Sequence, residues 1–246
     1  MIQKMPDRAM VVCAHPDDME YYCGGTVLAL TRNGCEVHAV IATDGNRGSL
    51  NPDVSPEALA RLRREEARKS AQILGVGAIT FLGISDGEVV PDLTLRSRLA
   101  RLYREHTPAL LLTFDPWKRY ELHPDHRAVG TAALDARLAA RLPLYFPEHL
   151  RDGLGTWSIR EILLFNTDQP DHFFDVSETF EGKIAALAVH RSQWSEIQID
   201  VESALAREAR QTGARAGYAL AEAFKRILIP GVTVSSYGWG MEGDPR

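Results

Sequence analysis

Several features are scarce or missing in this chain of 246 residues, and each absence excludes a class of protein. Only three cysteines occur, Cys13, Cys23 and Cys35, and none forms a C-x-x-C pair, which argues against a disulfide framework or a cysteine-bound zinc. No apolar run approaches the roughly 18–20 residues that span a bilayer, and the apolar stretch near the N-terminus is too short for a signal peptide. We therefore expect a soluble, cytoplasmic protein with reduced thiols and no membrane insertion.

An excess of positive charge is also missing. The chain carries 28 basic and 33 acidic side chains, a formal net charge of -5, so nothing supports a nucleic-acid partner. Apolar residues make up 45% and charged residues 25% of the chain, as in ordinary globular proteins with a sizeable core. No internal repeat, low-complexity segment or linker is visible, so one domain over residues 1–246 is the simplest interpretation.

Short apolar runs alternate with segments of helical periodicity along the chain. The expected strands are Ala9–Ala14, Glu36–Thr43, Ala78–Leu82, Ala109–Phe114, Leu144–Phe146, Glu161–Asn166 and Phe173–Val176. The expected helices are Gly24–Arg32, Pro56–Leu74, Leu93–His106, His123–Leu142, Ser177–Val189 and Ile199–Ala223. This alternation predicts an α/β fold, a single Rossmann-like domain with a mostly parallel sheet flanked by helices on both faces. A helical segment at about 199–246 would end the chain.

The carboxyl edge of a parallel sheet is where such folds bind their ligands. The loops that follow Ala14, Thr43, Leu82 and Phe114 all leave the expected sheet at that edge, and they are polar. The loop Asp44–Ser55 is longer than most connections, and loops of this length are often functional. We therefore expect the functional residues in these four loops.

The loop after the first expected strand carries His15, Asp17, Asp18 and Glu20 within six residues. Asp17 followed by Glu20 fits a variant of the capping box at a helix start, which explains one aspartate and the glutamate. His15 and Asp18, three residues apart, are suited to share a divalent metal ion, because such ions accept imidazole and carboxylate together. The residues of this loop support both interpretations.

A second polar cluster, His123-Pro124-Asp125-His126, follows the fourth expected strand and begins a helix. Alone, such a cluster is also compatible with a solvated helix start. Because both clusters follow strands of one sheet, the fold would bring them together across the 108 residues between Asp18 and His126. One aspartate with two histidines leaves a coordination position open for water, which is typical of a catalytic zinc rather than a structural one.

Six elements in this order resemble the LmbE-like N-deacetylases, also called the PIG-L or N-acetylglucosaminyl-phosphatidylinositol deacetylase family. The first element is AHPDDMEYYCGGT, residues 14–26. The others are Thr43–Gly48, Arg64–Glu66 with Leu74–Val76, Phe81–Gly83 with Asp86–Gly87, His123–Arg127, and Lys183 with His190–Gln193. The resemblance covers about residues 9–195, and only Asn46 departs from it, since relatives often have an acidic residue there.

The resemblance implies an enzyme that removes an acetyl group from an N-acetylated sugar or glycoconjugate, such as an N-acetylglucosaminyl thiol precursor or a chito-oligosaccharide. It implies a zinc ion, although the same ligands accept other divalent metals. The implied ligands are His15, Asp18 and His126. The resemblance further implies three catalytic roles: Asp17 as the general base, His123 as the acid or oxyanion stabiliser, and Asp125 as the residue that orients His123.

Four further residues are candidates for contact with a small-molecule substrate: Arg47, Glu20, Tyr120 and His190. The resemblance implies that Arg47 lies near the substrate loop. Aromatic rings such as Tyr120 stack on sugars, although packing is their commoner use. His190 would either border the cavity or end a helix.

Two other functional classes stay open. A metal- or sugar-binding module without turnover would need neither Asp17 nor His123, so the presence of both favours an enzyme. The segment Gly83–Gly87 matches the G-x-S-x-G elbow of serine hydrolases, with Ser85 as the nucleophile. An elbow opens directly into a helix, however, and Pro91 disfavours one here. The oligomeric state is left open, and a homo-oligomer is compatible with this chain.

Overall fold

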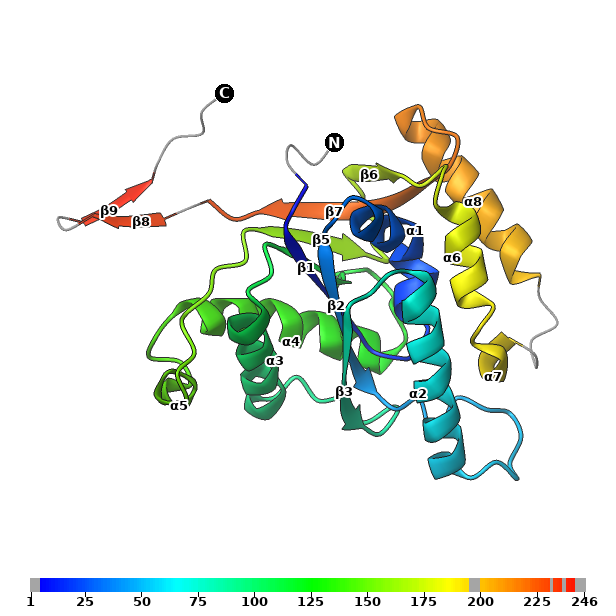
Figure 1. Cartoon of the computed structure of the whole chain (residues 1–246), viewed down its shortest axis with the longest axis horizontal. Helices are drawn as coiled ribbons and strands as arrows, with labels where there is room; N and C mark the ends of the chain where they lie inside the picture. Colours follow the sequence, from blue (N-terminus) through cyan, green and yellow to red (C-terminus); the bar gives the residue numbers. More distant parts are fainter. Residues whose placement is uncertain (1–4, 195–199, 231, 236–237, 242–246) are drawn as a thin grey trace.

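Seven strands of the chain form one mixed sheet in the order β3-β2-β1-β4-β5-β7-β6 (Figure 1). The computed structural model describes residues 5–194, 200–230, 232–235 and 238–241. The strands are β1 Arg8–Cys13, β2 Glu36–Thr43, β3 Ala78–Ile84, β4 Leu110–Phe114, β5 Glu161–Phe165, β6 His172–Asp175 and β7 Ala221–Leu228. The first five pair in parallel, whereas β7 is antiparallel to β5 and β6. A separate hairpin joins β8 Val232–Ser235 to β9 Gly238–Met241.

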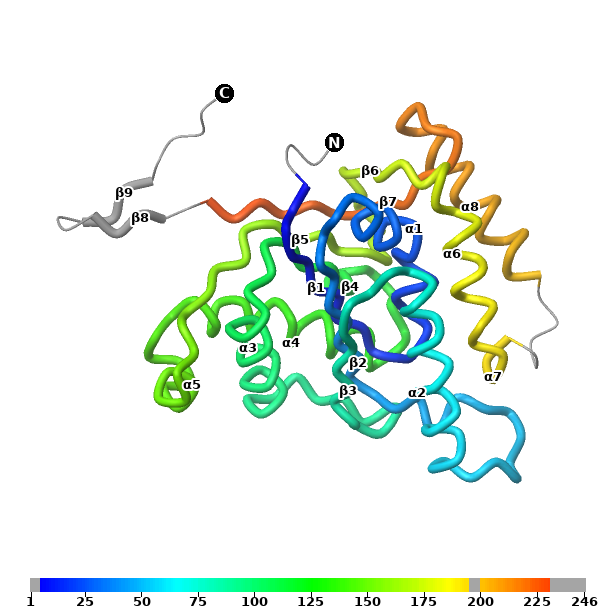
Figure 2. Tube along the Cα trace, viewed as in Figure 1, coloured from blue at the N-terminus to red at the C-terminus, as the bar shows by residue number. Residues whose placement is uncertain are grey.

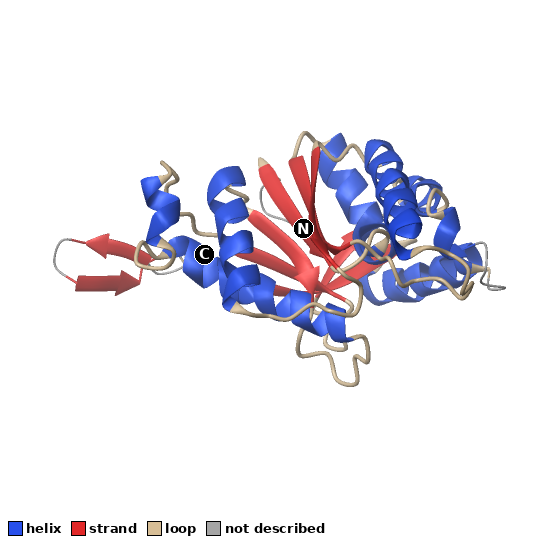
Figure 3. Cartoon of the chain, turned by 90° about the horizontal axis from the view of Figure 1, so that it is seen from below, coloured by secondary structure: helices blue, strands red, loops and turns tan. Residues whose placement is uncertain are grey.

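Helices cover both faces of this sheet (Figure 3). Their bounds are α1 Asp18–Arg32, α2 Pro56–Ile73, α3 Leu93–His106, α4 Pro124–Arg141, α5 Pro147–Arg151, α6 Phe180–Leu187, α7 Arg191–Trp194 and α8 Val201–Ala216. α3 packs beside α4, and α6 contacts both α1 and α2. The predicted α/β fold with a mostly parallel, helix-covered sheet is therefore confirmed. No described helix has the length and apolar character needed to cross a membrane.

The central strands are apolar without alternation because both of their faces are covered. All five residues of β4 are buried, as are the last five of β1. Met10, Leu111 and Phe165 are among the largest fully buried side chains of this core. Burial on both faces is what a parallel sheet between two helix layers requires, and it explains why the strands could be recognised as continuous apolar runs.

The order of the strands brings two distant loops together. β1 pairs with both β2 and β4, and the labelled traces of the three strands run close together (Figure 2). In the register of β1 with β4, Val12 is the neighbour of Thr113. The Thr113 hydroxyl donates a hydrogen bond of 3.0 Å to the carbonyl of Val12, 101 residues earlier. The loops after β1 and β4 consequently leave the sheet side by side at its carboxyl edge.

The largest difference from the sequence prediction lies near the C-terminus. The helix expected over Ile199–Ala223 ends at Ala216 and is followed by β7, which inserts between β5 and β6. Gly217 adopts a φ of 79°, a left-handed conformation that glycine allows and that ends helices. The prediction was wrong because the helical pattern was extended through this glycine. Of the expected helical segment at about 199–246, residues 199, 231, 236–237 and 242–246 lie outside the described residues.

Two smaller differences concern other element boundaries. Leu144–Phe146 is a turn that leads into α5, not a strand. α1 begins at Asp18 rather than Gly24 and has non-helical backbone angles at Cys23, so the sequence prediction recognised only the half after this kink. The half before the kink starts within the predicted functional loop. All three cysteines are free and buried, as expected.

Candidate active site

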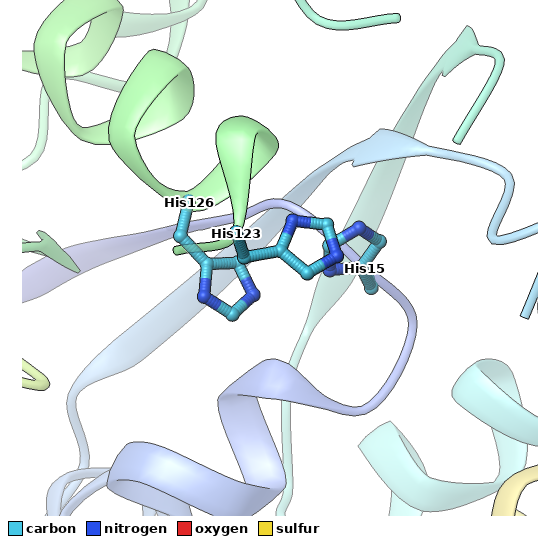
Figure 4. A group of neighbouring side chains, drawn as sticks. All are labelled: His15, His123 and His126. Atoms are coloured by element: carbon cyan, nitrogen blue, oxygen red, sulfur yellow. The ribbon is translucent and has the colours of Figure 1, made fainter. Parts of the chain in front are cut away.

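Three histidines from the two predicted loops come together at the carboxyl edge of the sheet (Figure 4). His123 and His126 project from the start of α4 toward His15, in the loop that follows β1. The ring centroids of His15 and His123 are 4.5 Å apart, and those of His123 and His126 are 4.4 Å apart. The fold therefore joins the two clusters as the sequence analysis expected.

Asp18 lies between two of these imidazoles. Its Oδ2 is 3.4 Å from Nδ1 of His15, and its Oδ1 is 3.5 Å from Nε2 of His126. The backbone amides of Ala14 and His15 donate to Oδ2 at 3.0 and 2.7 Å, which fixes the carboxylate. Although burial disfavours its charge, His15 and His126 hold the pKa of Asp18 well below its ordinary value.

The spacing of these donor atoms suits a divalent metal ion. Donors about 2.0–2.1 Å from one tetrahedral zinc ion lie roughly 3.4 Å from one another, close to the distances around Asp18. Two imidazoles and a carboxylate are also a usual donor set for such ions. His123 contributes a third imidazole within 4.8 Å of the other two. The three histidines therefore fit a metal, and the ligand set implied by the resemblance, His15, Asp18 and His126, shares two of them.

Asp125 has a different partner from the one that the resemblance implies. Its Oδ2 lies 3.3 Å from Nε2 of His15, and its oxygens accept hydrogen bonds from the amides of Gly87 and Val89 at 2.7 and 3.2 Å. Within the described part of the chain, no hydrogen bond joins it to His123. Asp125 therefore orients His15 through the nitrogen that faces away from Asp18.

Asp86 is a site residue that the sequence analysis missed. Its Oδ1 lies 3.3 Å from Nε2 of His15, beside the contact that Asp125 makes with the same nitrogen. Although burial disfavours ionisation, the hydrogen bond with His15 lowers the pKa of Asp86. A signal was available, because Asp86 belongs to a polar loop that follows a strand at the carboxyl edge.

Asp17 does not cap α1, in contrast to the capping interpretation. Its side chain makes no capping hydrogen bond, and its Oδ1 accepts one from Arg63 of α2 at 3.1 Å. Burial raises the pKa of Asp17 to about 6, while the Arg63 guanidinium acts in the opposite direction. Asp17 is thus an ionisable carboxylate next to Asp18, held by a cation rather than by the helix start.

Arg63 is a second residue that the sequence analysis missed. It is 2% exposed and donates a further hydrogen bond of 3.0 Å to the carbonyl of Gly45. On α2 it shares the buried face with Leu59 and Ala67, four residues before and after it. An arginine at an apolar position of the helical period is a signal that could have identified it.

Two candidates for substrate contact are buried behind the site. Glu20 accepts a hydrogen bond of 2.6 Å from Ser70 and lies 3.5 Å from Nε2 of His190, which has no exposed surface. Burial lowers the pKa of His190, but the carboxylates of Glu20, Asp17 and Glu66 together outweigh it, so the net shift is upward. Both residues support the site from within the protein, which argues against direct contact with a substrate.

The other two candidates lie on the rim. The side chain of Arg47 is half exposed, pairs with Glu88 and donates to the carbonyl of Asp86 at 2.8 Å. Tyr120 is 85% exposed and has a positive φ of 61°. Both are accessible to a substrate, but neither contacts the histidines in the described structure.

Ser85 lacks the surroundings of a serine nucleophile. Its hydroxyl accepts a hydrogen bond of 3.1 Å from Asn46, and no described histidine contacts it. The next helix, α3, begins only at Leu93, so the segment is not the strand-to-helix turn of an elbow. These observations exclude the serine-hydrolase interpretation.

His123 lies between the other two histidines, and one of its ring nitrogens, Nδ1, is buried without a hydrogen bond among the described residues. Burial, together with His15 and His126, lowers the pKa of His123 below its ordinary value. The lowered pKa favours the neutral form of the imidazole. A neutral ring can still donate one N–H to a substrate.

Aromatic side chains border the open side of the site. A cavity of about 280 Å³ is lined by Asp17, Asp18, Tyr21, Tyr22 and Trp194. The rings of Tyr21 and Trp194 are stacked with centroids 6.1 Å apart. Tyr21 and Tyr22 also line a second cavity of about 200 Å³, so the two cavities adjoin along α1. Such walls suit a sugar, whose apolar faces pack on aromatic rings.

Comparison with known proteins identifies relatives of this chain. The sequence profile of the family described as PIG-L, GlcNAc-PI de-N-acetylase, matches residues 10–137. A diacetylchitobiose deacetylase of Thermococcus kodakarensis is 35% identical over 229 residues, which cover 92% of this chain and 85% of that protein. A probable N-acetyl-alpha-D-glucosaminyl L-malate deacetylase 2 of Bacillus cereus is 29% identical, and the match covers 77% of this chain and 84% of that protein.

A solved structure extends the similarity to the fold. The N,N'-diacetylchitobiose deacetylase from Pyrococcus horikoshii, in complex with an inhibitor, is 33% identical and superimposes with a TM-score of 0.87. The superposition covers 91% of this chain and 84% of that protein. The similar regions include both loops that form the histidine cluster. The chain therefore belongs to the PIG-L, or LmbE-like, family of deacetylases.

Proposed function

We propose that this protein is a metal-dependent hydrolase that removes the acetyl group from the amide nitrogen of an N-acetylated sugar in a small glycoconjugate. The names of two relatives contain such sugars, diacetylchitobiose and N-acetylglucosaminyl malate. The observation that carries the proposal is the position of Asp18 between His15 and His126, with the carboxylate of Asp17 beside it in one cavity. The proposed metal ligands and the proposed general base are thus close enough to act on one substrate.

Zinc is the ion that we propose for this site. His15, Asp18 and His126 would hold it and leave one position open. When bound, zinc lowers the pKa of a coordinated water to about 7 and polarises the acyl oxygen of the substrate. The outer nitrogen of His15 is held by Asp125 and Asp86, so that its Nδ1 stays directed at Asp18.

Asp17 is the residue that we assign as the general base. A carboxyl group with a pKa of about 6 is largely ionised at neutral pH, yet it is more basic than an ordinary aspartate. It would take a proton from the attacking water and then deliver it to the amine nitrogen as the C–N bond breaks. Arg63 keeps the carboxylate ionised and fixes its orientation through Oδ1.

His123 is the residue that we assign to the developing oxyanion. Because its pKa is lowered, it would act as a neutral N–H donor rather than as an imidazolium. The sugar would lie against Tyr21 and Tyr22, and the rest of the glycoconjugate would extend toward the second cavity that both rings line.

The release of free amine from a panel of N-acetylated sugars, with diacetylchitobiose and N-acetylglucosaminyl malate included, tests this proposal. We expect amine release that a chelator abolishes and added zinc restores. Asp17→Asn should bind zinc like the wild type but hydrolyse the substrate roughly 10²–10⁴-fold more slowly, because it lacks the base. Full activity of this variant would contradict the role of Asp17. Zinc binding without hydrolysis of any compound would instead identify a binding module.

A further inference from the structure

The two ring nitrogens of His126 have different surroundings. Nε2 faces Asp18, at 3.5 Å from its Oδ1, whereas Nδ1 faces Glu121, at 3.5 Å from its Oε1. Nδ1 is buried and forms no hydrogen bond among the described residues. If Nε2 serves as the metal ligand, the single proton of the neutral ring must reside on Nδ1. That N–H then points at the Glu121 carboxylate.

We propose that Glu121 is a positioning residue that holds the His126 imidazole in the orientation and tautomer required for metal binding. This inference rests on the proposed metal-dependent function. Metal-binding histidines usually donate their second ring N–H to a carboxylate, a backbone carbonyl or water, and this contact fixes the ring and raises its basicity. Glu121 would provide this contact from the loop before α4.

Packing alone does not determine which edge of the ring faces the metal. His126 is stacked between two rings, with centroid distances of 4.1 Å to Phe114 and 4.4 Å to His123. Stacking fixes the plane of an imidazole, but a half-turn about the Cβ–Cγ bond returns the ring to the same plane and preserves both stacks. The half-turn would replace the two nitrogens by ring carbons at the positions that face Asp18 and Glu121. The two carboxylates are therefore what selects the productive orientation.

Glu121 is itself held firmly in place. Its Oε1 accepts a hydrogen bond of 3.0 Å from the amide of His123, and its Oε2 accepts one of 2.7 Å from the Asn166 side chain. Lys118 lies 3.5 Å from Oε2. These partners belong to the start of α4, the end of β5 and the loop itself. Moving Glu121 away from His126 would break contacts with all three.

The other proposed histidine ligand has a matching arrangement. Nδ1 of His15 faces Asp18, and its Nε2 lies 3.3 Å from both Asp125 and Asp86. Each imidazole thus has the shared Asp18 on its inner nitrogen and a different carboxylate on its outer nitrogen. Glu121 is the counterpart of Asp125 on the opposite side of the cluster.

The alternative is that Glu121 has a purely structural role, and an experiment must distinguish this role from the positioning of His126. Through Asn166, Glu121 also ties its loop to the end of β5. Glu121→Gln combined with Asn166→Asp exchanges the amide and the carboxylate of this pair. The exchange keeps the hydrogen bond between the two side chains, the total charge and a carboxylate for Lys118. It leaves only a neutral amide oxygen for His126.

The test is the zinc dissociation constant, measured by competition with a chelator, together with the visible spectrum of the Co²⁺-loaded protein. We expect Glu121→Gln and the exchanged pair both to bind zinc about 10–100-fold more weakly than the wild type and to shift the Co²⁺ bands. Glu65→Gln, the same change at an exposed position of α2, should leave both readouts unchanged.

Wild-type affinity and an unaltered Co²⁺ spectrum in the exchanged pair would overturn the inference. Loss of the hydrogen bond with Asn166 would then account for any effect of Glu121→Gln. The inference is also overturned if all variants bind zinc like the wild type while thermal unfolding shows that they are folded. If the wild type binds neither ion, the proposed function itself fails, and this outcome is distinct from both others.

Discussion

Two clusters of buried charge lie on either side of the kink at Cys23 in α1, and they differ in how completely their polar atoms are paired. Before the kink, Asp18 lies among His15, His123 and His126, and two of these rings have a buried nitrogen without a hydrogen bond. After the kink, the Glu222 carboxylate of β7 is paired with the Lys183 ammonium of α6 at 2.7 Å.

In the cluster after the kink, both oxygens of the central carboxylate are paired. Glu222 accepts hydrogen bonds from the amides of Gly25 and Thr26 and from the Thr26 hydroxyl, at 3.0, 2.8 and 2.6 Å. Its negative charge thereby replaces the missing cap of the second half of α1, where helix amides are unpaired. The comparison teaches that a buried carboxylate with both oxygens paired supports the fold, whereas incomplete pairing of buried groups accompanies the candidate site.

The largest effect that we expect concerns stability, and it follows from removing the charge of Glu222. Glu222→Gln would leave the Lys183 ammonium buried without its counter-ion, and breaking a buried ion pair in this way costs about 3–5 kcal/mol. Urea unfolding measures this loss. Zinc affinity should stay at the wild-type value, because Glu222 does not contact the histidine cluster in the described structure.

Two further variants sharpen this prediction. Adding Lys183→Met to Glu222→Gln removes the stranded charge and should recover part of the lost stability. Glu202→Gln, at an exposed position of α8, should leave the unfolding free energy nearly unchanged. Weaker zinc binding by the stable double variant would show that the two clusters are not separate.

A smaller effect is expected where a cation supports the site. Arg63→Met removes the guanidinium that lowers the pKa of Asp17, so this pKa should rise above about 6. Asp17 acts as a base only when ionised, so the acid limb of the pH–rate profile should move to higher pH. Below the pKa, each unit of this rise lowers the ionised fraction about tenfold. Activity should recover when the pH is raised.

The matched control for this prediction is Arg68→Met on the same helix. Arg68 is half exposed and pairs with Glu65 rather than with Asp17. The acid limb of this variant should coincide with that of the wild type. An unshifted limb in Arg63→Met would show that Arg63 does not determine the ionisation of Asp17.

A third expected effect, on stability at acid pH, lies outside both clusters. Burial, together with His106, lowers the pKa of His38 to about 4, and Thr80 is its hydrogen-bond partner at 2.8 Å. An unfolded histidine titrates near pH 6.5. Between about pH 6.5 and 4 the unfolded state therefore binds more protons, and stability declines as the pH falls.

Denaturant unfolding of the wild type and His38→Gln at pH 7, 5 and 4 measures this contribution. The amide can keep the hydrogen bond to Thr80 but does not titrate, so the variant should lose less stability on acidification. Because the other histidines are common to both proteins, the difference isolates His38 together with its effect on the neighbouring His106. Equal losses in the two proteins would show that His38 contributes nothing to the acid sensitivity.

The part of the fold that follows local rules was predictable from the sequence. β2 was predicted with its observed bounds, and α2, α3 and α4 to within about one residue of theirs, because apolar runs, helical periodicity and terminating residues such as Gly75 mark them. β7 was missed because its antiparallel insertion depends on β5 and β6 rather than on a local signal. The first half of α1 was missed because its residues were attributed to a functional loop.

The candidate site shows the same division. The amino-acid sequence by itself determined which chemical groups are available and, through the strand–helix alternation, that the loops bearing His15 and His126 share one edge of a sheet. Only the tertiary structure decided the partners: Arg63 for Asp17, His15 for Asp125, and Glu121 for His126. The physical reason is that periodicity and turn chemistry act over a few residues, whereas the pairing of buried charges depends on distances between segments that meet only in the folded chain.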